Sequence, residues 1–283
     1  MTYRIIILLL LSFASSLVHA DESPASRAHY LANGGVMIER GETKILFDPL
    51  FRNDYGQYDL VPPETEAALF AGLAPWDGID AVFISHHHDD HFDPALMLEF
   101  LTTRTDIELF APQQAITALQ ALVEIPATTV LDRVHSITLD TGDSASAFEM
   151  GELLIEAVRI PHAGWPDRNT NVENIVFRVT LDEATTVMHL GDADPREQHF
   201  GKHAVHWHQR VTDLALPPFW FFLSAEGRDI LADRIGAGHA VGVHVPTRMP
   251  DDATNRPTEL QGFDLFTRPG ESRDISALSA VSP

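Results

Sequence analysis

The feature that most constrains this chain is a short apolar run followed directly by a cluster of histidines and aspartates. Residues 79–84 are typical of a buried strand, and the next residues supply four histidines and three aspartates (His86-His87-His88-Asp89-Asp90-His91-Phe92-Asp93). A loop at a strand end can aim several such side chains at one point. Imidazole and carboxylate groups bind borderline divalent ions such as zinc. The sequence therefore predicts a metal site here, in preference to a solvated polar turn.

The spacing within this loop, H-x-H-x-D-H, predicts two ions rather than one. His86 and His88 can converge on one ion from alternate positions. Asp90 and His91 point elsewhere and can hold a second ion. Pro94 then favours the start of a helix over residues 94–101.

This motif after a hydrophobic strand resembles the metallo-β-lactamase superfamily. The resemblance covers about residues 30–271 and implies an α/β fold, a four-layer αββα sandwich of two mixed β-sheets flanked by helices. It also implies three further ligands in a set order: His162 after the strand at 153–160, Asp192 after Gly191, and His244 at the end of a strand over 239–246. Asp194, a candidate helix N-cap, and His239 are the weaker alternatives to Asp192 and His244.

Under this resemblance the chain is a dinuclear hydrolase. One ion is held by His86, His88 and His162, the other by Asp90, His91 and His244, and Asp192 bridges them. The ligand set suits Zn²⁺, with Mn²⁺ or iron as alternatives. Two such ions lower the pKa of a shared water toward about 7, and the resulting metal-bound hydroxide attacks a carbonyl carbon or a phosphorus. Asp90 and His244 are the predicted catalytic residues; Asp90 could steer the water or carry a proton.

Two segments near the N-terminus narrow the resemblance to one branch. The run ending in Asp48-Pro49 is similar to the superfamily, in which this aspartate lies beneath the metal loop and orients it; a turn aspartate before proline is the alternative. Residues 30–35 are similar to the lactonase-like and phospholipase-like branch, although that branch often has a histidine where Asn33 stands. The branch implies hydrolysis of an ester, lactone or phosphodiester of a small molecule or lipid. The alternatives are a β-lactamase acting on β-lactam amides and a non-catalytic metal-binding protein of the same fold.

The charge balance restricts the class of substrate. The chain has 41 acidic and 19 basic residues, a formal net charge of −22. Such a surface repels phosphate backbones and anionic membranes, so a small-molecule substrate is expected and nucleic acid is not. The chain contains no cysteine, which excludes a thiol nucleophile and disulfides.

The ends of the chain predict export of a single domain. Residues 1–20 combine Arg4, an apolar run at 5–11 and a small-residue ending, as in a secretory signal peptide cleaved before Asp21. The apolar run is short for a membrane anchor, so a periplasmic or secreted protein without a stable anchor is expected. Residues 21–272 form one hydrolase domain, and residues 273–283 are a predicted disordered tail. The oligomeric state is not predicted.

A second histidine cluster has no counterpart in the resemblance. Residues 198–210 contain His199, His203, His206 and His208. This segment is either a mobile lid that contributes to substrate binding or a surface segment with incidental histidines. Elsewhere, the pattern predicts a strand near residues 128–131, a helix over 224–235 and an edge strand over 260–266.

Overall fold

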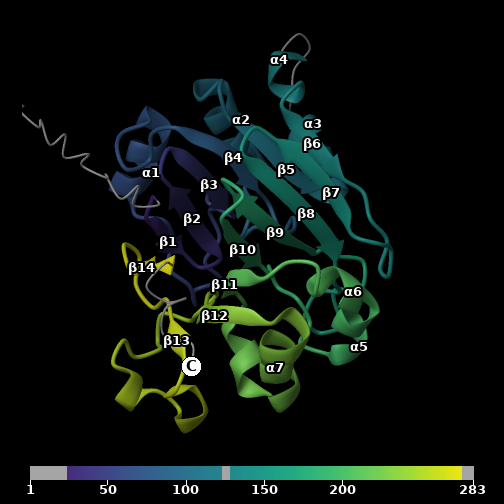
Figure 1. The fold of residues 1–283 in the computed structure, drawn as a ribbon. Helices are drawn as coiled ribbons and strands as arrows, with labels where there is room; N and C mark the ends of the chain where they lie inside the picture. The colour runs from purple at the N-terminus through teal and green to yellow at the C-terminus, as the bar shows by residue number, and fades with distance from the viewer. Residues whose placement is uncertain (1–23, 123–127, 276–283) are drawn as a thin grey trace, which may run out of the picture.

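The structure is a computed structural model that describes residues 24–122 and 128–275. The predicted signal peptide, residues 1–20, lies outside the described residues. Two seven-stranded mixed sheets pack face to face, and helices cover their outer faces (Figure 1). The predicted αββα sandwich is confirmed.

The first sheet is built from the N-terminal half of the chain and one strand from the C-terminus. Its order is β14-β1-β2-β3-β4-β5-β6, antiparallel from β14 to β3 and parallel from β3 to β6. Helical crossovers join the parallel strands, so their carboxyl ends share one edge. The elements are β1 (Ser26–Ala32), β2 (Gly35–Arg40), β3 (Thr43–Phe47), α1 (Pro63–Ala71), β4 (Ile79–Phe83), α2 (Pro94–Thr103), β5 (Glu108–Pro112), α3 (Gln113–Gln120), α4 (Thr128–Leu131), β6 (Val134–Ile137) and β14 (Ser272–Asp274).

The second sheet repeats this arrangement with the rest of the chain. Its order is β13-β12-β11-β10-β9-β8-β7, antiparallel from β7 to β10 and parallel from β10 to β13. The strands are β7 (Ser146–Met150), β8 (Leu153–Arg159), β9 (Ile175–Leu181), β10 (Thr185–His189), β11 (Thr212–Leu216), β12 (Ala237–Gly242) and β13 (Asp264–Leu265). The helical segments are α5 (Glu197–Phe200), η1 (Gly201–His203), α6 (Ala204–Trp207), η2 (Phe219–Leu223), α7 (Ala225–Asp229), η3 (Ile230–Ile235), η4 (Ala253–Asn255) and η5 (Thr258–Leu260).

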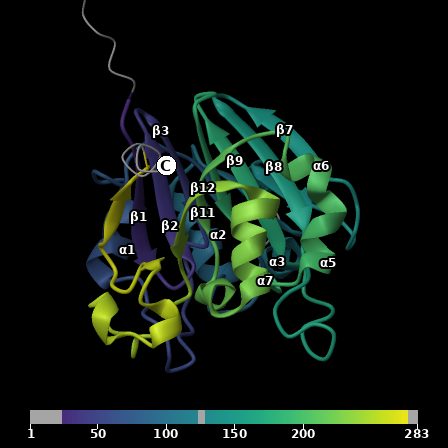
Figure 2. The same cartoon turned by 60° about the horizontal axis from the view of Figure 1, so that its bottom comes forward.

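Alternation along β4 explains how a continuous apolar run serves two cores. Ala81 and Phe83 face the second sheet, whereas Val82 and Ile84 face the helices α1 to α3. The Phe83 ring lies 5.2 Å, centroid to centroid, from Phe177 of the opposite sheet. A third core lies between the second sheet and α5, α6 and α7; Figure 2 shows α5 and α6 on the right of the molecule and α1 on its left.

Several element predictions needed correction. Residues 128–131 form the short helix α4 rather than a strand, and Val130 packs into the helix-side core. The β-branched residues there favour a strand, but strand propensity depends on context and here tertiary packing prevails. The predicted helix at 224–235 ends in a π-helical segment, η3, and the predicted strand at 260–266 is reduced to β13.

The C-terminal boundary is also later than predicted. Arg273 and Asp274 pair with β1, so the expectation of a disordered tail from residue 273 is wrong for these residues. Arg273 also binds the Asp264 carboxylate on β13 at 2.8 Å. This ion pair joins the edge strands of the two sheets. Residues 276–283 lie outside the described residues.

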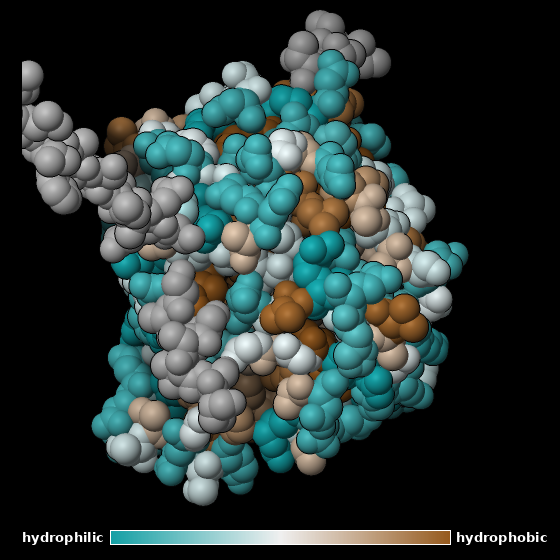
Figure 3. Space-filling view, in the orientation of Figure 1, coloured by the Kyte–Doolittle hydropathy of each residue, from teal (hydrophilic) through white to brown (hydrophobic). Residues whose placement is uncertain are grey.

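Hydrophilic residues predominate on the face shown in Figure 3, with separate hydrophobic patches between them. This agrees with the acidic composition. Within residues 24–122 and 128–275, no helix combines the length and the apolar character that crossing a membrane requires.

Candidate metal centre

The predicted ligands gather at one edge of the sandwich because four strands end there. The loop after β4 carries His86, His88, Asp90 and His91, while His162, Asp192 and His244 follow β8, β10 and β12. In the second sheet these three strands run in the same direction. The Ile175 N–H donates to the Ser85 carbonyl at 2.8 Å and so links the two sheets beside the loop. All seven predicted residues therefore lie together.

One group of ligand atoms is formed by three imidazoles. His86 Nε2 lies 3.1 Å from His88 Nδ1, and the His162 ring lies 4.9 Å from the His86 ring, centroid to centroid. One nitrogen from each of these residues lies within 4.8 Å of the others. This is the set predicted for the first ion.

A second group combines imidazoles with carboxylates. His244 Nε2 lies 3.2 Å from Asp90 Oδ2 and 3.4 Å from Asp192 Oδ2, and His91 Nε2 lies 3.3 Å from Asp192 Oδ1. The other Asp192 contact, 3.4 Å from Oδ2 to His162 Nε2, reaches the first group. Asp192 thus stands between the two groups, where a bridging carboxylate is predicted.

The rings of His86, His91 and His162 are each held through their Nδ1 atoms. Asp48, which is fully buried, accepts from the Ser85 N–H at 2.7 Å and the Ser85 hydroxyl at 2.6 Å, and lies 2.8 Å from His91 Nδ1. Ser85 Oγ also lies 2.9 Å from His86 Nδ1, and the Ala163 carbonyl lies 2.9 Å from His162 Nδ1. Asp48 occupies the orienting position that the resemblance implied.

The atoms that face inward are those without partners. Among the described residues, buried atoms that lack any hydrogen bond include the Nε2 atoms of His91, His162 and His244 and the Oδ1 atom of Asp192. Leaving buried polar groups unpaired is unfavourable unless something else satisfies them. Four such atoms, each from a different loop, converge here, so the donor set fits divalent ions with nitrogen and oxygen ligands. The assignment of each residue as a ligand stays a prediction.

Burial keeps two of the imidazoles neutral. It lowers the pKa of His88 to about 4, helped by the neighbouring His162, and together with His91 it lowers the pKa of His86 well below the ordinary value. Burial opposes ionisation of Asp192, but His244 and His91 outweigh it and hold the pKa of this carboxyl well below its usual range. His86, His88 and Asp192 are thereby kept in the forms that bind metal, neutral imidazole and ionised carboxylate.

Residues 27–205 match the family model described as Beta-lactamase superfamily domain, which spans every predicted ligand except His244. This chain belongs to the beta-lactamase superfamily. The sequence matches none of the curated proteins.

Solved structures agree with this membership at the level of fold. The metallo-beta-lactamase fold protein YhfI from Bacillus subtilis is 17% identical, with a TM-score of 0.58, and the match covers 89% of this chain and 99% of that one. The metallo hydrolase Igni18 from Ignicoccus hospitalis is 16% identical, with a TM-score of 0.54, and the match covers 88% and 97%. At such identities the likeness shows the fold alone.

Sequence reasoning missed several residues that position the centre of this superfamily member. Asn33 departs from the branch pattern, yet its side-chain amide donates to the Asp90 carbonyl at 2.8 Å and its backbone carbonyl accepts from the His244 N–H at 2.8 Å. Asn174 accepts from the Asp192 N–H at 2.9 Å. His189 is fully buried, and its Nε2 lies 2.8 Å from the Gly34 carbonyl. None of these contacts has a local sequence signal, because each joins residues far apart in the chain.

Aromatic side chains surround the centre. The rings of Tyr58 and Trp220 lie edge-on to His244 at centroid distances of 4.3 and 5.2 Å. Burial, with the charges of Asp192 and Asp90, raises the pKa of Tyr58 to about 12. The loop between β3 and α1 therefore reaches the centre through Tyr58.

The two alternative ligands lie outside the centre. His239 stands in β12 and pairs with Asp264 at 3.4 Å. Asp194 lies 3.3 Å from Arg196 Nε and 3.5 Å from His199 Nε2. It is not a helix cap, because α5 begins at Glu197 with Arg196 in the N-cap position.

The second histidine cluster does not form one site: His199, His203 and His206 contact separate buried neighbours, whereas His208 is exposed. His199 contacts Asp194 and the Trp165 ring, and His203 packs against Trp207. His206 lies 3.7 Å from Glu156, which forms a buried ion pair with Arg178 at 2.7 Å. These contacts attach the segment to the outer face of the second sheet, so they do not support a mobile lid.

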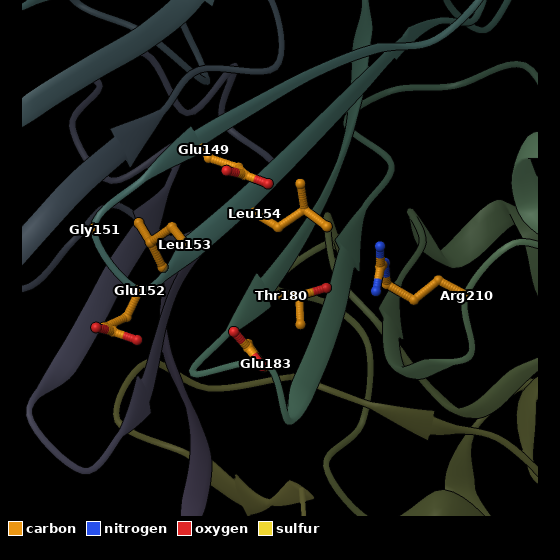
Figure 4. Close-up of a pocket in the computed structure, with 8 residues that line it drawn as sticks. All are labelled: Glu149, Gly151, Glu152, Leu153, Leu154, Thr180, Glu183 and Arg210. Atoms are coloured by element: carbon orange, nitrogen blue, oxygen red, sulfur yellow. The ribbon is translucent and has the colours of Figure 1, made fainter.

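A separate surface hollow lies at the opposite end of the second sheet (Figure 4). Its lining includes Glu149, Glu152, Glu183 and Arg210, near the start of β8 and the end of β9. Since the centre follows the end of β8, this hollow lies away from it. Among the described residues, none that line it belongs to a group able to hold a metal ion.

Proposed function

We propose that this protein is an exported dinuclear metal-dependent hydrolase of esters, lactones or phosphodiesters in small molecules or lipids. The observation that carries the proposal is the convergence of unpaired, buried nitrogen and carboxylate oxygen atoms in two adjoining groups. Membership of the beta-lactamase superfamily supports it. The names of the similar structures, which include a metallo hydrolase, agree with it.

The predicted ligands would bind two ions, three residues to each ion and one residue between them. His86, His88 and His162 would hold one ion, and Asp90, His91 and His244 the other, with Asp192 between them. Bound divalent ions supply a water of lowered pKa and a Lewis acid for the substrate. Zn²⁺ is the preferred ion, and Mn²⁺ or iron would suit the same ligands.

In hydrolysis, the oxygen of a water bonds to the carbonyl carbon or phosphorus, and the bond to the leaving oxygen breaks. The leaving oxygen must then gain a proton. Asp90 would relay this proton; its carboxylate lies 3.2 Å from His244 Nε2, and the Asn33 side-chain amide donates to its backbone carbonyl. Its side chain is almost fully buried, which keeps its orientation constant.

The surroundings favour a small substrate with an apolar part. Tyr58 and Trp220 flank His244 and offer ring faces for such a group. The net charge of −22 disfavours nucleic acid. The leader-like sequence of residues 1–20 supports export to the periplasm or the medium.

The test combines metal analysis with a substrate panel. Purified protein lacking residues 1–20 is analysed for metal per chain and assayed with a lactone, a phosphodiester and a chromogenic β-lactam. Two ions per chain with turnover of the lactone or the phosphodiester is the expected result. A preference for the β-lactam would assign the chain to the alternative class, and two ions without turnover would favour a non-catalytic metal-binding protein.

A further inference from the structure

Tyr58 touches the predicted ligand set through its ring, and the proposed function gives no role to its hydroxyl. It lies in the loop between β3 and α1, more than 25 residues before the metal loop begins. Its ring meets the His244 ring at 80°, with the centroids 4.3 Å apart. Tyr58 is half-buried, so its side chain contacts His244 and is also partly accessible to solvent.

Backbone hydrogen bonds hold this loop on both sides of the centre. The Asn53 N–H donates to the Asp89 carbonyl at 3.2 Å, which ties the loop to the metal loop. The Gln57 carbonyl accepts from the Thr247 N–H at 2.8 Å, which ties it to the segment after His244. The Tyr58 N–H itself donates to the Asp54 carbonyl at 3.0 Å. The position of Tyr58 is therefore defined by the same segments that carry Asp90 and His244.

The hydroxyl groups of the two tyrosines in this loop differ. The Tyr55 hydroxyl donates to Asp89. Among the described residues, none forms a hydrogen bond with the Tyr58 hydroxyl, which lies in the field of Asp192 and Asp90. A phenol is protonated at neutral pH, so this hydroxyl is a hydrogen-bond donor. Tyr58 thus offers an unused donor on a side chain that packs against His244.

We propose that the Tyr58 hydroxyl donates a hydrogen bond to the substrate oxygen on which negative charge develops during hydrolysis. This inference rests on the proposed function and adds a catalytic residue to it. Donors positioned in advance for a developing oxyanion contribute strongly to catalysis, because they need not reorganise during the reaction. The same donor would recognise a tetrahedral oxyanion, such as inorganic phosphate, that binds at the centre.

The test compares Tyr58→Phe with Tyr55→Phe. Both changes remove one phenol oxygen from the same loop, and Tyr58→Phe keeps the ring that packs on His244. Metal per chain, the dissociation constant of inorganic phosphate by calorimetry on the zinc-loaded protein, and kcat and KM are measured for each variant.

Tyr58→Phe is expected to weaken phosphate binding about tenfold or more, because a hydrogen bond to a charged acceptor is lost. A fall in kcat of about 100-fold, with little change in KM, is expected with the best substrate of the panel. Metal content should remain at the wild-type value, and Tyr55→Phe should change phosphate affinity less than twofold.

Wild-type phosphate affinity in Tyr58→Phe would overturn the inference, as would equal weakening by the two variants. Absence of phosphate binding to the zinc-loaded wild type would also overturn it. Failure of the proposed function has a different signature, namely no turnover of any panel substrate by the wild type. In that case the phosphate measurement still decides whether Tyr58 is a donor at the centre.

Discussion

At the scale of single residues, the centre depends on which atom of each side chain faces inward. His91 shows this most clearly, since Nδ1 is engaged by Asp48 and Nε2 lacks a partner. A histidine offers two possible ligand atoms, and an anchored second nitrogen selects one of them. This arrangement leads to specific predictions for substitutions of Asp192 and Asp48.

Asp192→Ala is expected to abolish binding of at least one ion and to reduce hydrolysis below detection. Asp192 contacts His91, His162 and His244, so its loss removes the carboxylate shared by both groups. Elemental analysis and activity assays measure the two effects. Two ions retained per chain would show that Asp192 does not bridge them.

Asp48→Ala is expected to weaken metal affinity about 10-fold to 100-fold, the usual effect of removing a residue that orients a ligand. Ser85 and His91 would lose their common acceptor. Metal titration by calorimetry measures the change.

Asp93→Ala is the matched control. Asp93 caps α2 by accepting from the Leu96 N–H, so this substitution should reduce the free energy of unfolding by about 1 kcal/mol and leave metal affinity unchanged. Equal affinities in the two variants would contradict the orienting role of Asp48.

At the scale of elements, the predicted ligands follow the ends of strands, and the turns that carry them pack closely against neighbouring side chains. Gly191 follows β10 in the left-handed region, at φ +54°. A Cβ atom there would lie 2.4 Å from Asn174 Oδ1 and 2.7 Å from Ser85 Cβ. Asn174 supports Asp192, and Ser85 contacts Asp48, so this turn joins the two halves of the centre.

Gly191→Ala is therefore expected to reduce the free energy of unfolding by about 3 kcal/mol and to weaken metal binding. Gly151→Ala is its control, because Gly151 has the same φ of +54° and its Cβ would meet no atom within 4 Å. The control should lose about 1–2 kcal/mol from backbone strain alone. Chemical denaturation measures both changes. Equal losses in the two variants would show that the Asn174 and Ser85 contacts can relax.

At the scale of the whole molecule, the two sheets are joined at their edges as well as through their core. Arg273 on β14 binds Asp264 on β13, and His239 on β12 also contacts this carboxylate. Burial alone would raise the pKa of Asp264, but hydrogen bonds from His239 and Arg273 outweigh it and lower that pKa to about 2. This edge contact therefore depends on pH.

Because the pKa of Asp264 is lower in the folded state than its ordinary value of 3.8, its contribution is complete above about pH 4 and is lost as the pH falls toward 2. Asp264→Asn should reduce stability by about 2 kcal/mol at neutral pH, and this difference from the wild type should shrink in acid. Denaturation at several pH values measures it. A stability difference that does not change with pH would contradict the lowered pKa of Asp264. The stability losses of Arg273→Ala and Asp264→Asn should be non-additive if the two residues form one contact.

The sequence by itself determined the kinds of ligand and their order, because local patterns record where strands end. The apolar run at residues 79–84 and the motif after it predicted a metal loop, and the resemblance they carry predicted the sandwich. The later ligands His162, Asp192 and His244 were found through that resemblance, and the structure brings them to the same edge.

Tertiary structure alone decided how the centre is completed. Asn33 and Tyr58 contact His244 from segments that no local sequence pattern connects with it. The histidines at 199, 203, 206 and 208 do not form one site, because each contacts a different neighbour. Strand β14 joins the first sheet because it pairs with the edge of β1 and because its Arg273 binds the Asp264 carboxylate. These features share one physical reason. Periodicity and turn signals describe residues that are close in sequence, whereas the contacts between distant residues depend on how the two sheets pack.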